Sequence, residues 1–147
     1  MRRYGENRRP DVKYIARPGA YGIIAQGRDL LLTLQILKKA EMQLPGGGID
    51  PGETPTQALH REVFEETGWL IATPRRVGTF RRFVFMPEYD LWAEKICMIY
   101  RAMPVRRMGP PREEFHEARW MDAEAATQAL GNSGDRFFAQ QHASSLR

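Results

Sequence analysis

Three glutamates crowd one short stretch of the chain, and acids at this spacing can hold a metal ion. Glu62, Glu65 and Glu66 fall within five positions, so on a helix they would share one stripe. Two of them would then form an i,i+4 pair of like charge, which destabilises a helix by about 0.2–0.5 kcal/mol. A bound cation would offset this cost, and carboxylate oxygens favour hard divalent ions such as Mg²⁺ or Mn²⁺ over zinc. The alternative is a solvated acidic face balanced by arginines, with Arg61 paired to Glu65.

A run of three glycines, Gly46-Gly47-Gly48, precedes the acids and favours the metal site over the solvated face. Glycine lets the backbone approach a ligand closely, and its carbonyl oxygens can serve as further hard ligands. Histidine and cysteine offer no competing site, because His60, His116 and His142 are scattered without ligand spacing and Cys97 is the single cysteine. The sequence therefore predicts a site built from oxygen ligands.

A helix over about 55–67 must position the acids. Thr54 is a good N-cap, Pro55 suits the first helical position, and Gln57 completes a capping box with Thr54. Gly68 suits the C-terminal stop. Leu59, Val63 and Thr67 line one face of this helix, and the three glutamates lie on another. The helix can therefore bury one stripe and present the acidic one.

Strands are expected on both sides of this helix. Residues 21–35 contain two short apolar runs joined by a turn at 26–29, which predicts a hairpin. Residues 75–103 predict two more strands, joined near 87–90, where Pro87 and Asp90 suit a connection.

A charged, proline-rich loop is expected at 104–118. A short strand containing Trp120 then leads to Asp122, which would cap a helix that ends near Leu130. A last helix would begin near Ser133 or Asp135. The expected strands outnumber the helices and do not alternate with them regularly, so the chain is a mixed α/β protein rather than a doubly wound parallel sheet.

The composition limits the class of protein. A length of 147 residues with 42% hydrophobic and 27% charged residues is typical of one soluble globular domain. The single cysteine excludes an internal disulfide and favours a cytoplasmic location. No apolar run approaches the roughly 20 residues of a membrane span. The net charge of +4, carried mainly by arginine, either attracts phosphate groups or keeps the surface soluble.

The glycine loop and the acidic helix together resemble the Nudix box, G-x5-E-x7-R-E-U-x-E-E-x-G-U, where U is a bulky aliphatic residue. Gly47 is followed after five residues by Glu53, and after seven more by the run REVFEETGW at 61–69. All seven fixed residues match and Val63 fills the first U position, whereas Trp69 departs by being aromatic. The resemblance covers about 14–140, because Nudix domains also carry a hairpin before the box and a strand bearing "RW" and a helix after it.

This resemblance implies a fold and a domain division. The fold would be a Nudix-type α/β/α sandwich with a mixed, strongly twisted central sheet, formed by a single domain over 13–147. Residues 1–12 are polar, charged and nearly free of apolar side chains, so we expect a flexible basic arm there.

The resemblance also implies roles for the residues of the box. The divalent metal, Mg²⁺ or Mn²⁺, would be bound by Glu62, Glu65, Glu66 and the carbonyl oxygen of Gly46. Glu53 and Arg61 would form a structural ion pair that holds the loop on the helix. Nudix enzymes cleave a phosphoanhydride bond in a nucleoside diphosphate linked to a further group X, and the metal would activate the attacking water.

The proton acceptor for this reaction is placed variably in the family. Glu62 is one candidate, and the loop offers three more acids, Glu113, Glu114 and Glu117. We favour Glu114, because it precedes Trp120 by six residues, a spacing similar to that of the loop ligand in Nudix enzymes that cleave oxidised nucleotides. The alternative is that all three are solvated loop charges.

Residues outside the box must recognise X. Arg81, Arg82 and Arg101 lie on expected strands and are candidates to bind the substrate phosphates, with a plain basic surface as the alternative. Glu94 is more simply a cross-strand partner for Arg81 or Arg82. Aromatic side chains of the strands could stack on a base or pack in the core; they are Tyr21, Phe83, Phe85, Tyr89, Trp92 and Tyr100.

The first expectation for function is hydrolysis of a nucleoside di- or triphosphate, an oxidised one included, because the chain is small and carries a loop acid. The alternatives are removal of pyrophosphate from RNA 5′ ends, which the basic arm would suit, and cleavage of dinucleoside polyphosphates. A nucleotide-binding module without turnover is less favoured, because no acid of the box is missing. The chain would act as a monomer or a homodimer.

Overall fold

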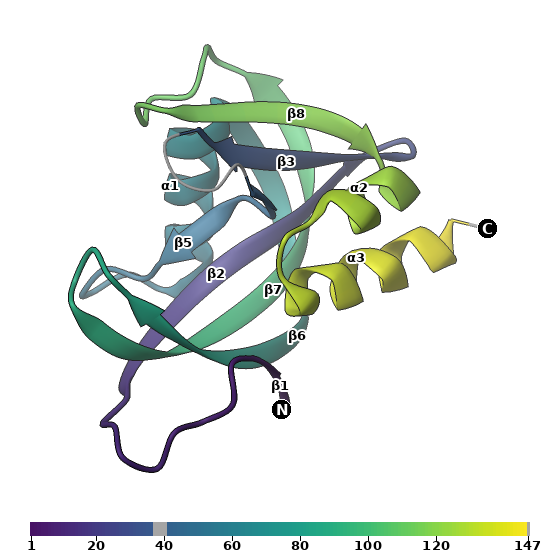
Figure 1. Ribbon diagram of the computed structural model, residues 1–147. Helices are drawn as coiled ribbons and strands as arrows, with labels where there is room; N and C mark the ends of the chain where they lie inside the picture. The colour runs from purple at the N-terminus through teal and green to yellow at the C-terminus, as the bar shows by residue number, and fades with distance from the viewer. Residues whose placement is uncertain (37–40, 147) are drawn as a thin grey trace.

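The structure is a computed structural model that describes residues 1–36 and 41–146, so residues 37–40 and 147 of the expected domain lie outside it. The described elements follow the order β1 (Arg2–Gly5), β2 (Ile15–Gln26), β3 (Asp29–Gln35), β4 (Met42–Gln43), β5 (Gly46–Gly48), α1 (Pro55–Thr67), β6 (Trp69–Met86), β7 (Leu91–Arg107), β8 (His116–Asp122), α2 (Ala123–Ala129) and α3 (Ser133–Ser145). The element order confirms a mixed α/β chain (Figure 1).

The strands of the described chain form a mixed sheet with β2 at its centre. The strand order is β1-β6-β7-β2-β3-β4, and β5 pairs with β2 while β8 pairs with β3. Strand β2 runs parallel to β7 and antiparallel to β3 and β5, whereas β6 and β7 form a long antiparallel hairpin. The short β5 lies beside β2 and carries the glycine run.

Two hydrophobic clusters lie on opposite faces of the sheet. One packs α1 against the strands through Leu59 and Val63, with Ile24 on β2. The other packs α2 and α3 against the strands and includes Ile23 and Phe138. Neighbouring residues such as Ile23 and Ile24 serve different clusters, because successive side chains of a strand point to opposite faces. Helices therefore cover both faces, as the expected sandwich requires (Figure 1).

Helix α1 has the predicted boundaries because its end signals are local. The Thr54 hydroxyl accepts a hydrogen bond from the Gln57 N–H at 3.2 Å, and the Gln57 side chain accepts one from the Thr54 N–H at 2.9 Å. Gly68 ends the helix with φ +78° and donates its N–H to the Phe64 carbonyl at 2.8 Å. A side chain at Gly68 would also collide with the Gly109 carbonyl, so glycine is required there on two grounds.

The first residues differ from the expectation of a flexible arm. Residues Arg2–Gly5 form β1, which runs parallel to β6 in the register Arg2↔Phe80 to Gly5↔Phe83. The Tyr4 ring packs edge-on against Phe80 with ring centroids 5.5 Å apart. Composition does not reveal this strand, because its hydrogen bonds and its packing come from a strand that is distant in sequence.

The strands after α1 are longer than expected. Strand β7 continues to Arg107 because its last residues pair with the start of β6, for example Trp69 with Arg107. With β8 beginning at His116, the loop expected at 104–118 is confined to 108–115. The hairpin turn at Gly27-Arg28 and the connection at 87–90 lie where they were predicted. Among residues 1–36 and 41–146, no helix has both the length and the apolar character needed to span a membrane.

Candidate metal and nucleotide site

The glycine run lies directly against the acidic stripe of α1. Gly46 has φ +148°, and a side chain there would collide with the backbone of Ala20 and Tyr21 on β2. A Cβ at Gly47 would lie 2.6–2.8 Å from the Glu62 carboxylate. Glycine at these positions therefore lets the loop backbone reach the carboxylates, which is the close approach that a shared ligand site requires.

Glu66 is the most deeply buried of the four box glutamates. Its side chain is 11% exposed, and its Oε1 accepts a hydrogen bond from the Gly46 N–H at 2.9 Å. Burial raises the pKa of Glu66 well above its usual range, and the charges of Glu62, Glu113 and Glu65 raise it further. A buried carboxylate among like charges is stabilised by a cation, so this donor set fits a hard divalent metal.

Arg61 ties the glycine loop to the helix. Its Nε and Nη2 donate to the two oxygens of Glu53, each at 2.8 Å, and its Nη2 also donates to the Gly48 carbonyl at 3.0 Å. The hydrogen bonds from Arg61 lower the pKa of Glu53 to about 2. Arg61 also donates to Glu62 at 2.9 Å and lies 3.4 Å from Glu65. The Arg61 guanidinium therefore bonds to Glu53 and Glu62 at the same time and holds the Glu62 carboxylate in place.

The loop after β7 brings one further acid to this stripe. The N–H groups of Arg112 and Glu113 donate to the Glu65 carbonyl at 2.8 and 3.0 Å, which docks the loop on the last turn of α1. Carboxylate oxygens of Glu113, Glu62 and Glu65 then lie within 4.8 Å of one another. Glu114, which the spacing to Trp120 favoured, is exposed and belongs to neither acidic group of the described chain. The backbone contacts with α1, which sequence spacing does not report, place Glu113 rather than Glu114 beside the acidic stripe.

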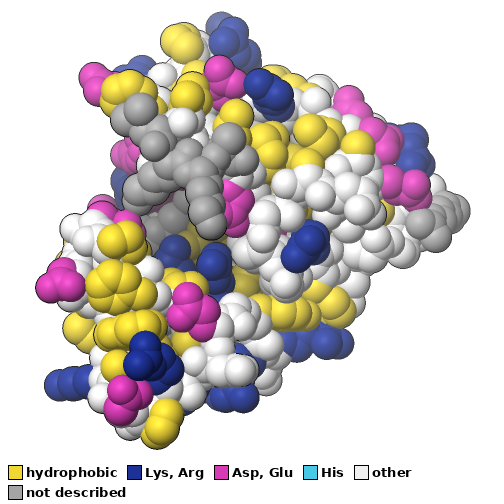
Figure 2. Space-filling model, in the orientation of Figure 1, with side chains coloured by type: hydrophobic (Ala, Val, Ile, Leu, Met, Phe, Trp, Pro, Cys, Tyr) yellow, Lys and Arg dark blue, Asp and Glu magenta, His cyan; other side chains and the backbone are white. Residues whose placement is uncertain are grey.

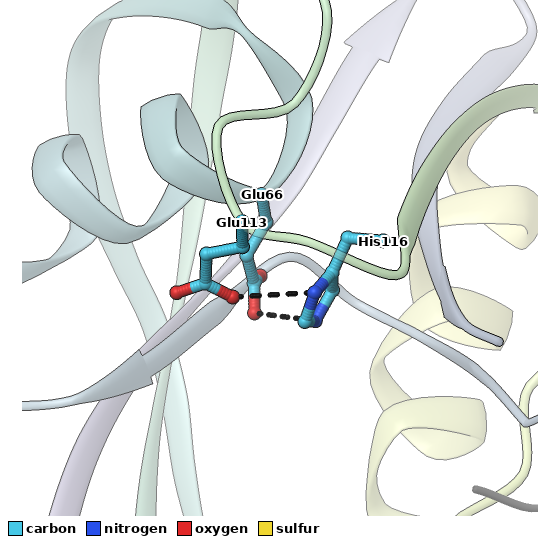
Figure 3. Close-up of side chains that lie close together, drawn as sticks. All are labelled: Glu66, Glu113 and His116. Atoms are coloured by element: carbon cyan, nitrogen blue, oxygen red, sulfur yellow. Dashed lines mark ion pairs between the residues drawn. The ribbon is translucent and has the colours of Figure 1, made fainter. Parts of the chain in front are cut away.

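A histidine completes a second group that sequence reasoning missed. His116, Glu66 and Glu113 point toward one another from β8, α1 and the loop (Figure 3). His116 Nδ1 lies 3.3 Å from Glu113 Oε2, and Nε2 lies 3.8 Å from Glu66 Oε2. The spacing of the histidines to one another gave no signal, but the position of His116 three residues after Glu113 could have done so.

A cavity of about 590 Å³ opens beside the glycine loop and Glu62. Strands β6 and β7 contribute Arg82 and Lys95, which lie directly opposite each other in the sheet. Asn132 and Asp135 at the start of α3 complete the wall. Figure 2 shows Lys and Arg side chains inside the hollow on this face. The cavity therefore connects the acidic stripe to a pair of cations.

Burial shifts the pKa of several titratable groups that line this cavity, Asp135 and Lys95 among them. It raises the pKa of Asp135 to about 6, although the carboxylate accepts a hydrogen bond from the Leu44 N–H at 3.3 Å. Burial and then the charge of Arg82 lower the pKa of Lys95. Lys95 was not among the predicted site residues, but it lies two residues from each of the buried Ala93 and Cys97 and so shares their face of the strand; a lysine on this inward face was an available signal.

The three predicted arginines are not brought together. Arg82 lines the cavity, whereas Arg81 pairs with Glu94 at 3.4 Å. Arg101 is exposed, and its charge lowers the pKa of His142 on α3, although burial is the larger cause. The aromatic side chains considered for base stacking also lie in different places. Tyr21 and Tyr89 line the cavity, whereas Tyr100 packs in the core below α1.

Residues 16–141 match the family model of the NUDIX domain. The chain therefore belongs to the Nudix family, as its box and its fold indicate. Solved structures agree with this fold. A NUDIX hydrolase from Nitrosomonas europaea superposes with a TM-score of 0.72 at 18% identity, covering 90% of this chain and 92% of that chain. The MutT NUDIX hydrolase from Burkholderia pseudomallei gives a TM-score of 0.70 at 20% identity, covering 86% and 98%.

Two curated relatives share shorter stretches of sequence. A Bacillus subtilis (strain 168) protein named "Putative 8-oxo-dGTP diphosphatase" is 34% identical over 74 residues, which make up 50% of each chain. An RNA pyrophosphohydrolase of Yersinia pestis (strain Pestoides F) is 42% identical over 52 residues, covering 35% of this chain and 30% of the relative. The matches thus span half or less of the length of these relatives.

Proposed function

We propose that this protein hydrolyses a phosphoanhydride bond of a nucleoside di- or triphosphate, an oxidised one included, with Mg²⁺ or Mn²⁺ bound at its acidic stripe. The observation that carries the proposal is the cavity of about 590 Å³, which joins Glu62 and the glycine loop to the cations Arg82 and Lys95. Its volume lies in the range of small-molecule sites. The metal ligands would be Glu62, Glu65, Glu66 and the carbonyl oxygen of Gly46.

The bound metal would neutralise the diphosphate and lower the pKa of a coordinated water. The chain's own residues hold this arrangement. Arg61 fixes the Glu62 carboxylate, and the Gly46 N–H fixes that of Glu66. Glu113 has a partly exposed carboxylate beside the stripe, and we assign it the proton acceptor's role because a base must reach the attacking water.

The far end of the cavity suits an anionic or electron-rich part of the substrate. Arg82 and Lys95 are like charges directly opposite in a sheet, an arrangement that nearby anionic groups stabilise, as Asp135 does in this cavity. The Arg82 Nε is buried without a hydrogen-bond partner in the described chain. Phosphate oxygens or the acceptor edge of a base would satisfy this donor. The name of the Bacillus subtilis relative, a diphosphatase of an oxidised nucleotide, agrees with such a substrate.

A substrate panel tests the proposal. Nucleoside di- and triphosphates, their oxidised forms, nucleotide sugars, dinucleoside polyphosphates and triphosphorylated RNA are incubated with Mg²⁺ or Mn²⁺, and the products are separated by chromatography. Glu65→Gln and Glu66→Gln should each lower turnover of the best substrate by about 10³-fold, because each removes a metal ligand. Glu114→Gln, an exposed acid of the same loop as Glu113, is the matched control and should retain turnover.

The proposal is wrong if the two box variants keep full turnover while folded. Tight nucleotide binding with no turnover on any member of the panel would instead identify a binding module.

A second candidate, removal of pyrophosphate from RNA 5′ ends, is favoured by a group of exposed arginines on β6 and β7. Residues 68–87 and 96–112 contain eight arginines and no aspartate or glutamate. Arg75, Arg76, Arg101, Arg106 and Arg107 are all exposed. Trp69, Trp120 and Arg107 also line a cavity of about 280 Å³ near the end of α1. Basic surfaces with aromatic side chains bind single-stranded nucleic acid, and activity confined to the RNA substrate would promote this candidate.

A further inference from the structure

The imidazole of His116 lies between two carboxylates that come from different elements (Figure 3). Its side chain is 13% exposed, close to the 11% of Glu66, so both groups are largely removed from water. Nδ1 faces the loop acid Glu113, and Nε2 faces the helix acid Glu66. The ring therefore offers one nitrogen to each neighbour.

The neighbours of Nδ1 determine which nitrogen carries the proton. Nδ1 lies 3.3 Å from Glu113 Oε2 and 3.4 Å from the Glu114 carbonyl oxygen. A carbonyl oxygen can only accept a hydrogen bond, so Nδ1 must be the donor. In the neutral ring this leaves a lone pair on Nε2, which is the form that binds metals.

The lone pair of Nε2 faces Glu66 Oε2 across 3.8 Å. This separation is too long for a hydrogen bond. It is shorter than the sum of two metal–ligand bonds of about 2.0–2.2 Å each, so one ion can contact both atoms. Glu66 Oε1 is already bound by the Gly46 N–H at 2.9 Å, which leaves Oε2 for the ion.

We propose that His116 is a nitrogen ligand of the divalent ion that Glu66 holds, with Nε2 as the ligand atom. Nδ1 then donates to the Glu114 carbonyl oxygen and lies beside the Glu113 carboxylate, because metal-bound histidines commonly donate their other N–H to a carbonyl or a carboxylate. The inference rests on the proposed metal site and is independent of the substrate. It changes the expected site from oxygen ligands alone to a mixed oxygen and nitrogen set.

An imidazole ligand alters which ion the site prefers. Nitrogen is a softer ligand than a carboxylate oxygen, so His116 favours transition ions such as Mn²⁺ over Mg²⁺. Replacing His116 with glutamine should therefore reduce the preference for Mn²⁺ over Mg²⁺ on the order of 10-fold. Glutamine keeps a polar side chain on β8, and the pairing of His116 with Gln35 is made by the backbone.

The test uses the full chain loaded with one equivalent of Mn²⁺ and electron spin-echo envelope modulation, which detects a nitrogen nucleus bonded to the ion. The wild type should show the coupling of a histidine nitrogen, and His116→Gln should lose it. The chain has three histidines, and His60→Gln, an exposed position on α1, is the matched control that should retain the coupling. Competition between Mn²⁺ and Mg²⁺ gives the preference of each variant.

Circular dichroism shows whether His116→Gln is folded, and Glu113→Gln provides a second variant. It should keep the histidine coupling while binding Mn²⁺ more weakly, because it removes the negative charge that lies 3.3 Å from Nδ1. A wild type that binds Mn²⁺ through Glu66 without histidine coupling would overturn the inference and leave the metal site standing. Failure of the wild type to bind Mn²⁺, or binding unaffected by Glu66→Gln, would overturn both.

Discussion

Replacing Gly47 with alanine places a methyl group against the carboxylate of Glu62. The new Cβ would lie 2.6–2.8 Å from the carboxylate atoms, where an ordinary contact is 3.4–4 Å, so the carboxylate must move by at least about 0.8 Å to relieve the shortest contact. It cannot move freely, because Arg61 donates to it at 2.9 Å. A displacement approaching 1 Å at a reacting centre lowers the rate by on the order of 10²-fold.

The same change should have little effect on the fold. The displaced group is the end of a side chain rather than backbone, and Gly47 does not have a positive φ. We therefore expect Gly47→Ala to lower turnover about 10²-fold and to weaken Mn²⁺ binding. The free energy of unfolding should change by less than about 1 kcal/mol. Turnover of the best substrate, Mn²⁺ titration and urea unfolding measure the three quantities.

Gly48→Ala is the matched control, because a Cβ at Gly48 meets nothing within 4 Å and its φ is not positive. It should keep wild-type turnover and metal affinity. The reasoning is refuted if Gly47→Ala behaves like the wild type, or if Gly48→Ala loses as much activity as Gly47→Ala.

Three further predictions concern charged side chains, two of them at this site and one on the basic surface. Arg61 lowers the pKa of Glu53 from 4.5 to about 2, so their pairing stabilises the fold above pH 4.5 and this stabilisation is lost as the pH falls toward 2. Arg61→Met should remove this part of the pH dependence of urea unfolding, and an unchanged profile would contradict the assignment. Burial raises the pKa of Asp135 from 3.8 to about 6, so the free energy of unfolding should fall as the pH rises from about 4 to 6. Asp135→Asn should make the free energy of unfolding nearly independent of pH across this window, and a pH dependence that persists in the variant would show that another group causes it. If RNA is bound, Arg106→Ala and Arg107→Ala should each reduce the slope of log affinity against log salt concentration by about 0.7, as measured by titration of single-stranded RNA at several salt concentrations. The control is Arg28→Ala, in the hairpin turn and paired with Asp122, which should leave the slope unchanged.

Features that depend on neighbours in sequence were predictable. The boundaries of α1 follow from Thr54, Gln57 and Gly68, because a capping box and a left-handed stop are made within one turn of the helix. The hairpin at Gly27-Arg28 is local in the same way. The spacing of the box acids likewise determines that they share a stripe, since helical geometry alone sets it.

Features that depend on distant partners were not predictable. Strand β1 forms because β6 offers an edge to Arg2–Gly5, and composition alone assigned these residues to an arm. Glu113 rather than Glu114 reaches the acids because the loop backbone bonds to the Glu65 carbonyl. His116 faces Glu66 because β8 pairs with β3 in one particular register.

The sequence by itself determined the family, the helix that carries the acids and the fit of those acids to a hard divalent ion, because all three follow from residue types at fixed local spacings. Only the tertiary structure decided what surrounds the acidic stripe and what lines the cavity. Arg82, Lys95 and Asp135 come from β6, β7 and α3, and they meet through strand pairing and through the packing of α3 on the sheet. Such contacts join residues far apart in the chain, so no local pattern encodes them.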